Sequence, residues 1–280
     1  MSYFKIKSYA KINLALNVIG KSKYLHKIES IVGFLDLHDE IKIKKIKNQN
    51  HKIIFKGKFS DKINSNNTIS QLFNNIEKKK LLKNKYQITV KKNIPSKAGL
   101  GGGSMNAACL FKFFIKKRLI RLKKKEIIKI SNSVGSDVIL GLYSTSLVLK
   151  KNNHISILRP KNKFNVLIVK PNFGCSTQKI YSKLKKFSKQ EFKSTSKNMF
   201  SINFLKNSKN DLEAIALEKY PKLRKLKNFL VNLSDTEFVR MTGSGSAIIA
   251  YFNSVKKCKE AEKKVKNQFR NYWCKTSKTI

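Results

Sequence analysis

Apolar and polar residues alternate along segment 12–18 near the start of the chain. This period of two is typical of a strand with one buried face and one polar face. Further segments rich in β-branched and aromatic residues predict additional strands at 29–37, 39–46, 51–55 and 86–90. We therefore expect the N-terminal part of the chain to build a sheet.

Helical spacing follows this predicted sheet. Apolar residues recur three and four positions apart along 68–79, and Thr68 stands where a helix cap is expected. The same pattern predicts helices at 104–118, 124–133, 211–219, 221–230 and 254–268, interspersed with strands at 146–149, 164–169, 237–241 and 247–252. Because both halves mix strands and helices, the sequence predicts an α+β fold with two domains, 1–158 and 159–280.

The composition is that of a globular chain. With 280 residues, 41% of them hydrophobic, it can bury one large core or two moderate ones. Lys, Arg or Asn interrupts every run that could span a membrane, and the N-terminus lacks a signal-peptide cleavage site, so we expect a cytoplasmic protein. The cysteines lie too far apart in sequence for a zinc or redox motif, and we expect reduced thiols at Cys109, Cys175, Cys258 and Cys274.

The formal net charge of +45 has two interpretations. It is typical of a protein that binds nucleic acid through its phosphates. However, the basic residues are mostly Lys, spread over the whole chain and accompanied by abundant Asn and Ile, whose codons are all rich in A and T. A binding site would gather its charge in one patch, so drift in composition is favoured, with neither a specific nucleic acid nor a membrane as partner.

Glycines at 99 and 101–103 lie between a predicted strand and a predicted helix. A turn without side chains at the start of a helix lets backbone N–H groups and the helix dipole point at one anion. The segment matches neither the P-loop, which has Lys after its last Gly, nor the dinucleotide fingerprint. It favours a triphosphate-binding loop, with a tight turn that binds nothing as the alternative.

Phosphoryl transfer also needs a carboxylate that orients the acceptor hydroxyl and a cation near the transferred charge. Asp137 follows a predicted helix and has no obvious local partner, although a helix cap is the alternative role. Lys11 lies on the polar face of the first strand beside Asn13, although it could be one more surface lysine. A second glycine segment, 240–247, could close on the nucleotide and its acceptor from the opposite side.

A series of short motifs resembles a known family. In chain order they read AKINLAL, LH, FLDLHDEI, NTI, GLGGGSMNAA, GSDV, NDLE and RMTGSGSA. Over essentially the whole chain, this order is similar to that of the 4-diphosphocytidyl-2-C-methyl-D-erythritol kinases of the GHMP kinase superfamily. The alternatives are another GHMP kinase that acts on a small alcohol, or a basic nucleic-acid-binding protein that has kept this scaffold.

The resemblance implies a two-domain GHMP kinase fold with the active site in the inter-domain cleft. It implies ATP as co-substrate, Mg²⁺, and phosphorylation of the 2-hydroxyl of 4-diphosphocytidyl-2-C-methyl-D-erythritol. Lys11 and Asp137 would be the catalytic pair, Asn67 would lie near the adenine, and Ser104 would be the magnesium contact of the loop. The ATP phosphates would be held by Pro95, Ser96, Lys97, Ala98, Gly99, Leu100, Gly101, Gly102, Gly103, Ser104 and Met105.

For the second substrate, the resemblance implies contacts from Asn13, His26, Tyr181, Leu25, Thr242 and Gly243. His26 and Tyr181 would recognise the cytosine, Tyr181 as one half of an aromatic clamp. The family has a Tyr-His pair where this chain has Leu25-His26, so the other aromatic half of the clamp is missing. Tyr24 could take its place if the turn shifts by one residue.

Overall fold

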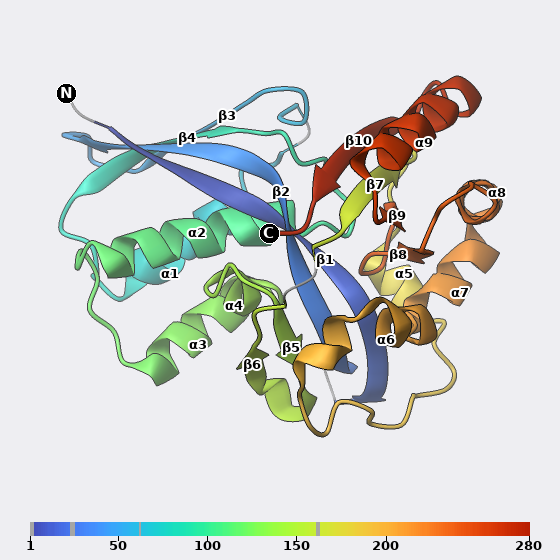
Figure 1. Ribbon diagram of the computed structural model, residues 1–280. Coiled ribbons are helices and arrows are strands. Elements are labelled where there is room, and N and C mark those ends of the chain that lie inside the picture. Colours follow the sequence, from blue (N-terminus) through green and yellow to red (C-terminus); the bar gives the residue numbers. More distant parts are fainter. Residues whose placement is uncertain (1–2, 23–25, 62, 161–162) are drawn as a thin grey trace. The chain divides into compact units, whose positions relative to one another are not determined.

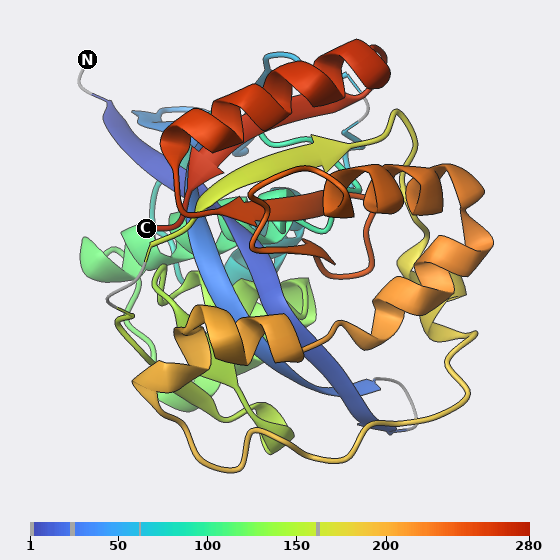
Figure 2. The same ribbon diagram turned by 45° about the vertical axis from the view of Figure 1, so that its right-hand side comes forward.

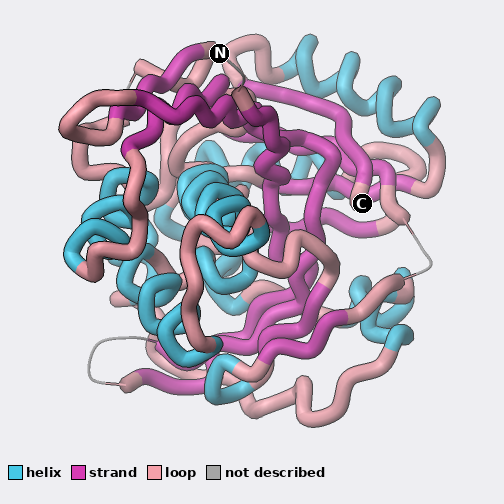
Figure 3. The backbone as a smooth tube through the Cα atoms, turned by 90° about the vertical axis from the view of Figure 1, so that its left-hand side faces the viewer, coloured by secondary structure: helices cyan, strands magenta, loops and turns pink. Residues whose placement is uncertain are grey.

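The chain folds into two compact units, each built from separate segments. In the computed structural model, residues 3–22, 26–61, 63–160 and 163–280 are described, and helices and strands alternate along them (Figures 1 and 3). The first unit contains the chain up to Lys11, Leu37–Ser96 and Gly101–Ser144. The second contains Ile12–Asp36, Lys97–Leu100 and Thr145–Ile280. The predicted domain boundary at 158 and the predicted cleft stay predictions.

Two long strands contribute to both units, and the first unit adds two strands and several helices to them. The elements are β1 (Phe4–Lys21), β2 (His26–Ile46), β3 (Lys52–Lys56), α1 (Thr68–Lys78), β4 (Lys85–Lys91), α2 (Gly102–Lys116), α3 (Lys124–Val134) and α4 (Val138–Gly141). Within the first unit, β4 runs antiparallel to β2 and parallel to β3.

Helices α1 and α2 cover the sheet of the first unit (Figure 1). Their apolar faces bury Leu72 and Phe111 in one core with Ile41 of β2 and Ile88 of β4. Burial of such side chains stabilises a fold by roughly 1.5–3 kcal/mol each relative to exposure. This packing fixes the start of α2, and with it the glycine segment that precedes the helix.

The second unit contains an antiparallel sheet in the order β10-β7-β9-β8. Its further elements are β5 (Leu147–Leu149), the 3-10 turn η1 (Lys151–Asn153), β6 (Ile155–Ile157), β7 (Asn165–Lys170), α5 (Thr177–Tyr181), η2 (Lys197–Phe200), α6 (Ile202–Asn207), α7 (Asp211–Lys219), α8 (Pro221–Val231), β8 (Phe238–Met241), β9 (Ile248–Phe252), α9 (Val255–Gln268) and β10 (Trp273–Lys278). Helix α9 lies along β7 and β10, seen in yellow-green and red in Figure 2. Leu226 of α8 and Ala261 of α9 share one core with Ile248 of β9.

Most predicted elements are confirmed, two predictions are wrong in detail, and one strand was not predicted. The strands expected at 29–37 and 39–46 form one continuous strand, β2. Asn67 caps α1 in place of Thr68, because its side-chain carbonyl accepts from the amides of Ile69 and Ser70. No strand was expected at β10, although it pairs with β7 along its full length.

The structure also bears on two expectations from the composition, which concern the cysteines and membrane-spanning segments. All the cysteines are free, and Cys175 and Cys258 are buried as core residues. Among the residues that the structure describes, no helix is both long enough and apolar enough to cross a membrane.

Candidate active site

Lys11 and Asp137, predicted as a pair, are in direct contact within the first unit. The Lys11 Nζ lies 3.0 Å from Asp137 Oδ2. Asp137 occupies the cap position of α4, but its side chain makes no capping hydrogen bond, so the ion pair and not the cap engages its carboxylate. Lys11 is 4% exposed and Asp137 29% exposed, so the carboxylate keeps one side open for a ligand.

The glycine segment brings the start of α2 against Lys11. Gly101 has left-handed backbone angles, with φ of 67°, and a Cβ at this position would lie 2.7 Å from Lys11 Cγ. At Gly102, a Cβ would lie 3.1 Å from Ile94 and 3.4 Å from Lys92 Nζ. Because the first N–H groups of a helix have no intrahelical partners, the start of α2 offers backbone donors beside two lysines. The arrangement suits a phosphate group.

Asp39 and Lys92 form a buried ion pair beneath this segment. Their side chains are 0% and 5% exposed, and Lys92 Nζ donates to Asp39 Oδ2. Asp39 Oδ1 also accepts from the amides of Asn93 (2.7 Å) and Ile94 (2.9 Å). A buried carboxylate that accepts several hydrogen bonds holds its partners firmly, since leaving any of them unpaired is costly. Asp39 belongs to the FLDLHDEI motif, but sequence reasoning gave it no role.

The start of α1 is tied to the glycine segment. Thr68 Oγ1 donates to the carbonyl of Gly103 at 2.7 Å. The Asn67 side chain accepts from two amides at the start of α1, and its Nδ2 donates to the carbonyls of Asn64 and Ser65. Asn67 therefore positions the helix, and its expected location near the adenine stays a prediction.

Of the other residues in the predicted phosphate loop, some are buried and some are exposed. Pro95, Ala98, Leu100 and Met105 are buried, whereas Ser96 and Lys97 are exposed. The side chain of Met105 packs against Gly141, where a Cβ would lie 3.0 Å from its Cε. Met105 thus supports the core of the first unit, and any ligand contact from it would come through its backbone.

In the second unit, Gly99 meets Thr242 of the second glycine segment. Gly99 has φ of 74°, and a Cβ there would lie 2.1 Å from the carbonyl oxygen of Thr242. The Thr242 hydroxyl donates to the Gly99 carbonyl (3.1 Å) and accepts from the Asn13 amide (3.0 Å). Asn13 Oδ1 would lie 3.5 Å from a Cβ added to Gly243. The structure thus brings together Asn13, Thr242 and Gly243, which were all predicted as substrate contacts.

Asn210 and Arg240 support this cluster, and sequence reasoning missed both. Asn210 Nδ2 donates to the carbonyls of Met241 and Gly243, each at 2.8 Å. The Arg240 guanidinium is buried and donates to the carbonyl of Leu14, next to Asn13 in β1. Asn210 lies in the NDLE motif, so the motif was visible in the sequence but the contact 31 residues away was not.

His26 and Tyr181, predicted to recognise a base, are also neighbours in the second unit. Their ring centroids lie 4.6 Å apart with an interplanar angle of 34°. Burial, with a smaller contribution from the charge of Lys21, lowers the pKa of His26, which favours the neutral imidazole. A neutral imidazole can both donate and accept a hydrogen bond at the edge of a base. Leu25 and Tyr24 lie outside the described residues.

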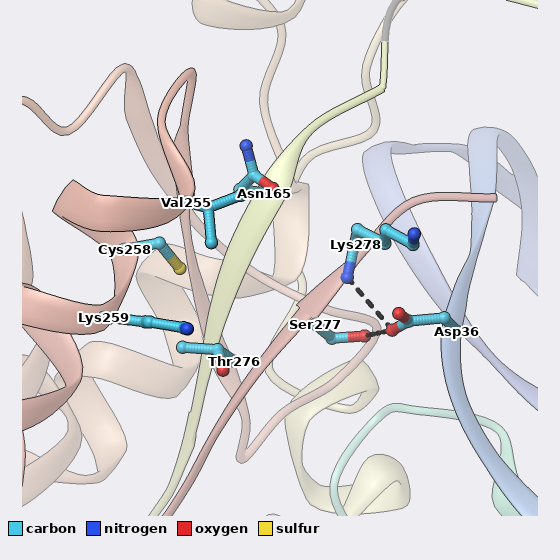
Figure 4. Close-up of a pocket in the computed structure, with 8 residues that line it drawn as sticks. All are labelled: Asp36, Asn165, Val255, Cys258, Lys259, Thr276, Ser277 and Lys278. Atoms are coloured by element: carbon cyan, nitrogen blue, oxygen red, sulfur yellow. Dashed lines mark hydrogen bonds between the residues drawn. The ribbon is translucent and has the colours of Figure 1, made fainter.

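A surface hollow of about 300 Å³ lies elsewhere in the second unit, among β7, α9 and β10 (Figure 4). Its wall includes Asp36, whose Oδ1 accepts from the Ser277 hydroxyl and from the Lys278 amide. These bonds attach β10 to β2, which is a structural role. None of the predicted site residues lines this hollow.

Replacing Gly101 with alanine should disturb the candidate site without unfolding the protein. The added Cβ would displace Lys11, and alanine is strained at a φ of 67°. We expect kcat/KM for ATP-dependent phosphorylation to fall about 10-fold, in line with a strain of roughly 1–3 kcal/mol. Gly33→Ala is the control, because Gly33 does not have left-handed backbone angles and a Cβ there would make an ordinary contact, 3.4 Å from Leu14 Cδ1. Equal activities of the two variants in a steady-state assay would contradict the close packing of Gly101 on Lys11.

Comparison with known proteins shows which family model and which relatives the chain is similar to. The family described as GHMP kinases N terminal domain matches residues 67–145, which include α1, α2 and Asp137. A 4-diphosphocytidyl-2-C-methyl-D-erythritol kinase of Pelagibacter ubique (strain HTCC1062) is 54% identical over 281 residues, covering 100% of both chains.

Solved structures share the fold at much lower identity. The crystal structure of a 4-(cytidine 5'-diphospho)-2C-methyl-D-erythritol kinase superposes with a TM-score of 0.79 at 19% identity, covering 98% of this chain and 99% of the other. A homoserine kinase from Cytophaga hutchinsonii reaches 0.73 at 14% identity, covering 100% and 95%. The predicted GHMP kinase fold is therefore confirmed, but kinases with different acceptors share it. The match at 54% identity shows to which of these kinase families the chain belongs.

Proposed function

The chain belongs to the family of 4-diphosphocytidyl-2-C-methyl-D-erythritol kinases, and we propose that it transfers the γ-phosphoryl group of ATP to the 2-hydroxyl of 4-diphosphocytidyl-2-C-methyl-D-erythritol. The products are ADP and the 2-phosphorylated compound, and the reaction belongs to the biosynthesis of isoprenoid precursors. We expect the reaction in the cytoplasm, where ATP is available.

The Lys11–Asp137 pair is the observation that carries the proposal. The 29% exposed carboxylate, at the start of α4, is held at 3.0 Å from the buried ammonium group of Lys11, whose side chain lies beside Gly101 of the glycine segment. In our mechanism Asp137 orients the acceptor hydroxyl and accepts its proton as the oxygen attacks the γ-phosphorus. The bond from the γ-phosphorus to the β–γ bridging oxygen breaks, and ADP leaves with that oxygen. Lys11 holds Asp137 in place and stabilises the negative charge around the transferred group.

The phosphates of ATP are assigned to the segment from Pro95 to Met105. Backbone N–H groups at the start of α2 supply donors, and the Lys11 side chain lies beside Gly101. Thr68 and the Asp39–Lys92 pair keep the segment in place before any ligand arrives. Such preorganised donors need little rearrangement during the reaction, which is why they stabilise charge effectively.

Mg²⁺ would enter this site together with ATP. The described residues contain no group of three or more His, Cys, Asp or Glu side chains that could hold a metal ion. Mg²⁺ usually keeps several waters and binds one or two protein oxygens together with substrate phosphates. Ser104 Oγ, which would lie 3.5 Å from a Cβ added to Gly135, is the protein donor that we assign to it. When bound, the ion neutralises phosphate charge.

The acceptor substrate is assigned to the predicted contact residues that lie close together in the second unit. Asn13, Thr242 and Gly243 form the polar cluster that would contact its diphosphate and methylerythritol parts. The neutral imidazole of His26 would recognise the edge of the cytosine, and the Tyr181 ring would pack against the base. Leu25 is assigned as an aliphatic contact to the same base.

Replacing Tyr181 with alanine should weaken binding of the cytidylyl substrate selectively. Loss of an aromatic contact and its buried area should raise the KM for this substrate about 10-fold, with the KM for ATP within about twofold. Tyr3→Ala, at a tyrosine that is 49% exposed in the first unit, is the control. If Tyr181→Ala changes both KM values equally, or neither, the base site is assigned to the wrong residue.

A coupled assay of ADP release tests the function as a whole. Purified protein is given ATP, Mg²⁺ and one acceptor at a time: the cytidylyl substrate, homoserine or mevalonate. We expect turnover with the cytidylyl substrate and a kcat/KM at least about 100-fold lower with the other two. Turnover with homoserine or mevalonate alone would make the chain a GHMP kinase of different specificity.

A further inference from the structure

Strand β8 leads directly into Thr242 and Gly243, and it is an outer strand of its sheet. The peptide groups of successive residues in a strand point alternately to its two edges. The Thr242 amide points toward β9, because it donates to the Ala247 carbonyl at 3.1 Å. The peptide groups of residues 239 and 241 therefore point to the opposite edge. In the part of the chain that the structure describes, no strand pairs with that edge.

Three polar side chains take the place of a partner strand along this edge. Lys227 of α8 donates to the Val239 carbonyl, and Glu213 of α7 accepts from the Met241 amide. Asn210, the cap residue of α7, donates to the Met241 carbonyl at 2.8 Å. The edge of a sheet normally carries unpaired N–H and C=O groups. Here side chains from one helical segment pair with them.

The Asn210 side chain extends this pairing beyond the end of β8. Its Nδ2 also donates to the Gly243 carbonyl at 2.8 Å, and its Oδ1 accepts from the Leu212 amide at 3.0 Å. Asn210 is 6% exposed. Because both N–H groups and the oxygen bond to backbone, the side chain positions the backbone and does not bind a ligand. Thr242 lies between the two carbonyls that it holds.

The backbone beside Asn210 is attached to β1, which carries a third acceptor contact. The Lys209 carbonyl accepts from the Leu16 amide of β1 at 2.9 Å. The same strand carries Asn13, whose amide donates to the Thr242 hydroxyl at 3.0 Å. Asn210 is therefore bonded to one end of the acceptor cluster and lies beside the strand that carries the other. The separate hydrogen bonds fix the three contacts relative to one another.

We propose that Asn210 and Glu213 are positioning residues of the acceptor site. They occupy the free edge of β8 and so set where Thr242 and Gly243 lie, without touching the substrate themselves. The inference rests on the proposed function, because that function assigns Thr242 and Gly243 to the acceptor. A displacement of about 1 Å at a substrate contact can lower the rate about 100-fold, so a residue that acts only through the backbone can have a large effect.

Asn210→Asp tests the two donated hydrogen bonds by themselves. Aspartate has the same shape and can still cap α7, but it cannot donate to the carbonyls of Met241 and Gly243. We expect the KM for the cytidylyl substrate to rise about 10-fold while the KM for ATP stays within about threefold. Amide hydrogen exchange of residues 240–247 in the ligand-free protein should be about 10-fold faster. A folding defect alone would lower the active fraction and leave both KM values unchanged.

Two further comparisons control for general effects. Asn165→Asp is the matched control, because it removes a donated bond to the Asn253 carbonyl elsewhere in the same sheet, and it should leave the KM values and the exchange of residues 240–247 unchanged. Glu213→Ala removes the acceptor of the Met241 amide and should raise the acceptor KM roughly 3- to 10-fold. Glu213→Gln keeps an acceptor oxygen and should restore most of the loss.

The outcomes separate this inference from the proposed function. Faster exchange of residues 240–247 in Asn210→Asp, in a wild-type protein that does not turn over the cytidylyl substrate, would support the positioning and refute the reaction. If the wild-type protein is active and Asn210→Asp keeps the acceptor KM within twofold, the inference is overturned, whether or not exchange becomes faster. Equal changes in Asn165→Asp would show a general loss of stability and would also overturn it.

Discussion

Replacing Asp137 with asparagine should lower kcat by about 100-fold or more while the KM for ATP changes only a few-fold, since general-base contributions are of this size. Asparagine has nearly the same shape but cannot accept the proton of the acceptor hydroxyl. It also removes the charge that pairs with Lys11 Nζ at 3.0 Å. The backbone at the start of α2 should be unaffected, so nucleotide binding should persist.

Asp235→Asn is the matched control for this variant. Asp235 also pairs with a lysine, Lys257, but both side chains are more than 40% exposed and Asp235 lies in the second unit. Exposed pairs contribute little to stability, so the control should keep wild-type activity within about twofold. If Asp137→Asn loses ATP affinity as strongly as it loses kcat, then Asp137 belongs to the nucleotide site and not to the acceptor site.

Replacing Lys11 with methionine should have an effect of similar size. Lys11 is 4% exposed, and methionine fills the same space without the charge. Loss of a buried, preorganised positive group near the transferred phosphate should lower kcat by about 100-fold or more. Lys257→Met removes the exposed counterpart and should leave kcat unchanged. Melting temperatures from circular dichroism would show whether each variant is folded.

The double variant Lys11→Met/Asp137→Asn tests whether the two residues act as one unit. Residues that act together in catalysis are strongly non-additive, so the double variant should be about as slow as the slower single variant. If the two effects instead multiply, to about 10,000-fold or more, the residues act independently and the contact between them has no role in catalysis.

Much of the candidate site could be predicted because its signals are local. The glycine segment, the strand before it and the helix after it are adjacent in sequence, and their order alone predicts a phosphate site. Lys11 and Asp137 are 126 residues apart in the sequence, yet each lies in a short motif, and the resemblance to a kinase family identified them as a pair. In the structure their charged groups lie 3.0 Å apart, and their catalytic role stays a prediction.

The supporting contacts could not be predicted, because each depends on distant pairing that leaves no local pattern. The predicted strands 29–37 and 39–46 were separated at His38, next to the charged Asp39, but the charge of Asp39 is matched by Lys92 and β2 continues through both positions. Asn210 holds the carbonyl of Gly243, 33 positions later. The sequence of β10, WCKTSK, does not alternate strictly between apolar and polar residues, and only pairing with β7 makes it a strand.

The phosphorus NMR spectrum of the reaction product tests the central claim most directly. Purified protein is incubated with ATP, Mg²⁺ and 4-diphosphocytidyl-2-C-methyl-D-erythritol, and the spectrum is followed as ADP accumulates. We predict one new phosphomonoester signal, equal in amount to the ADP formed, from a phosphate on the 2-hydroxyl, and its absence with Asp137→Asn over the same time. ADP release without a new phosphomonoester, or a phosphate on a different hydroxyl, would contradict the proposed reaction.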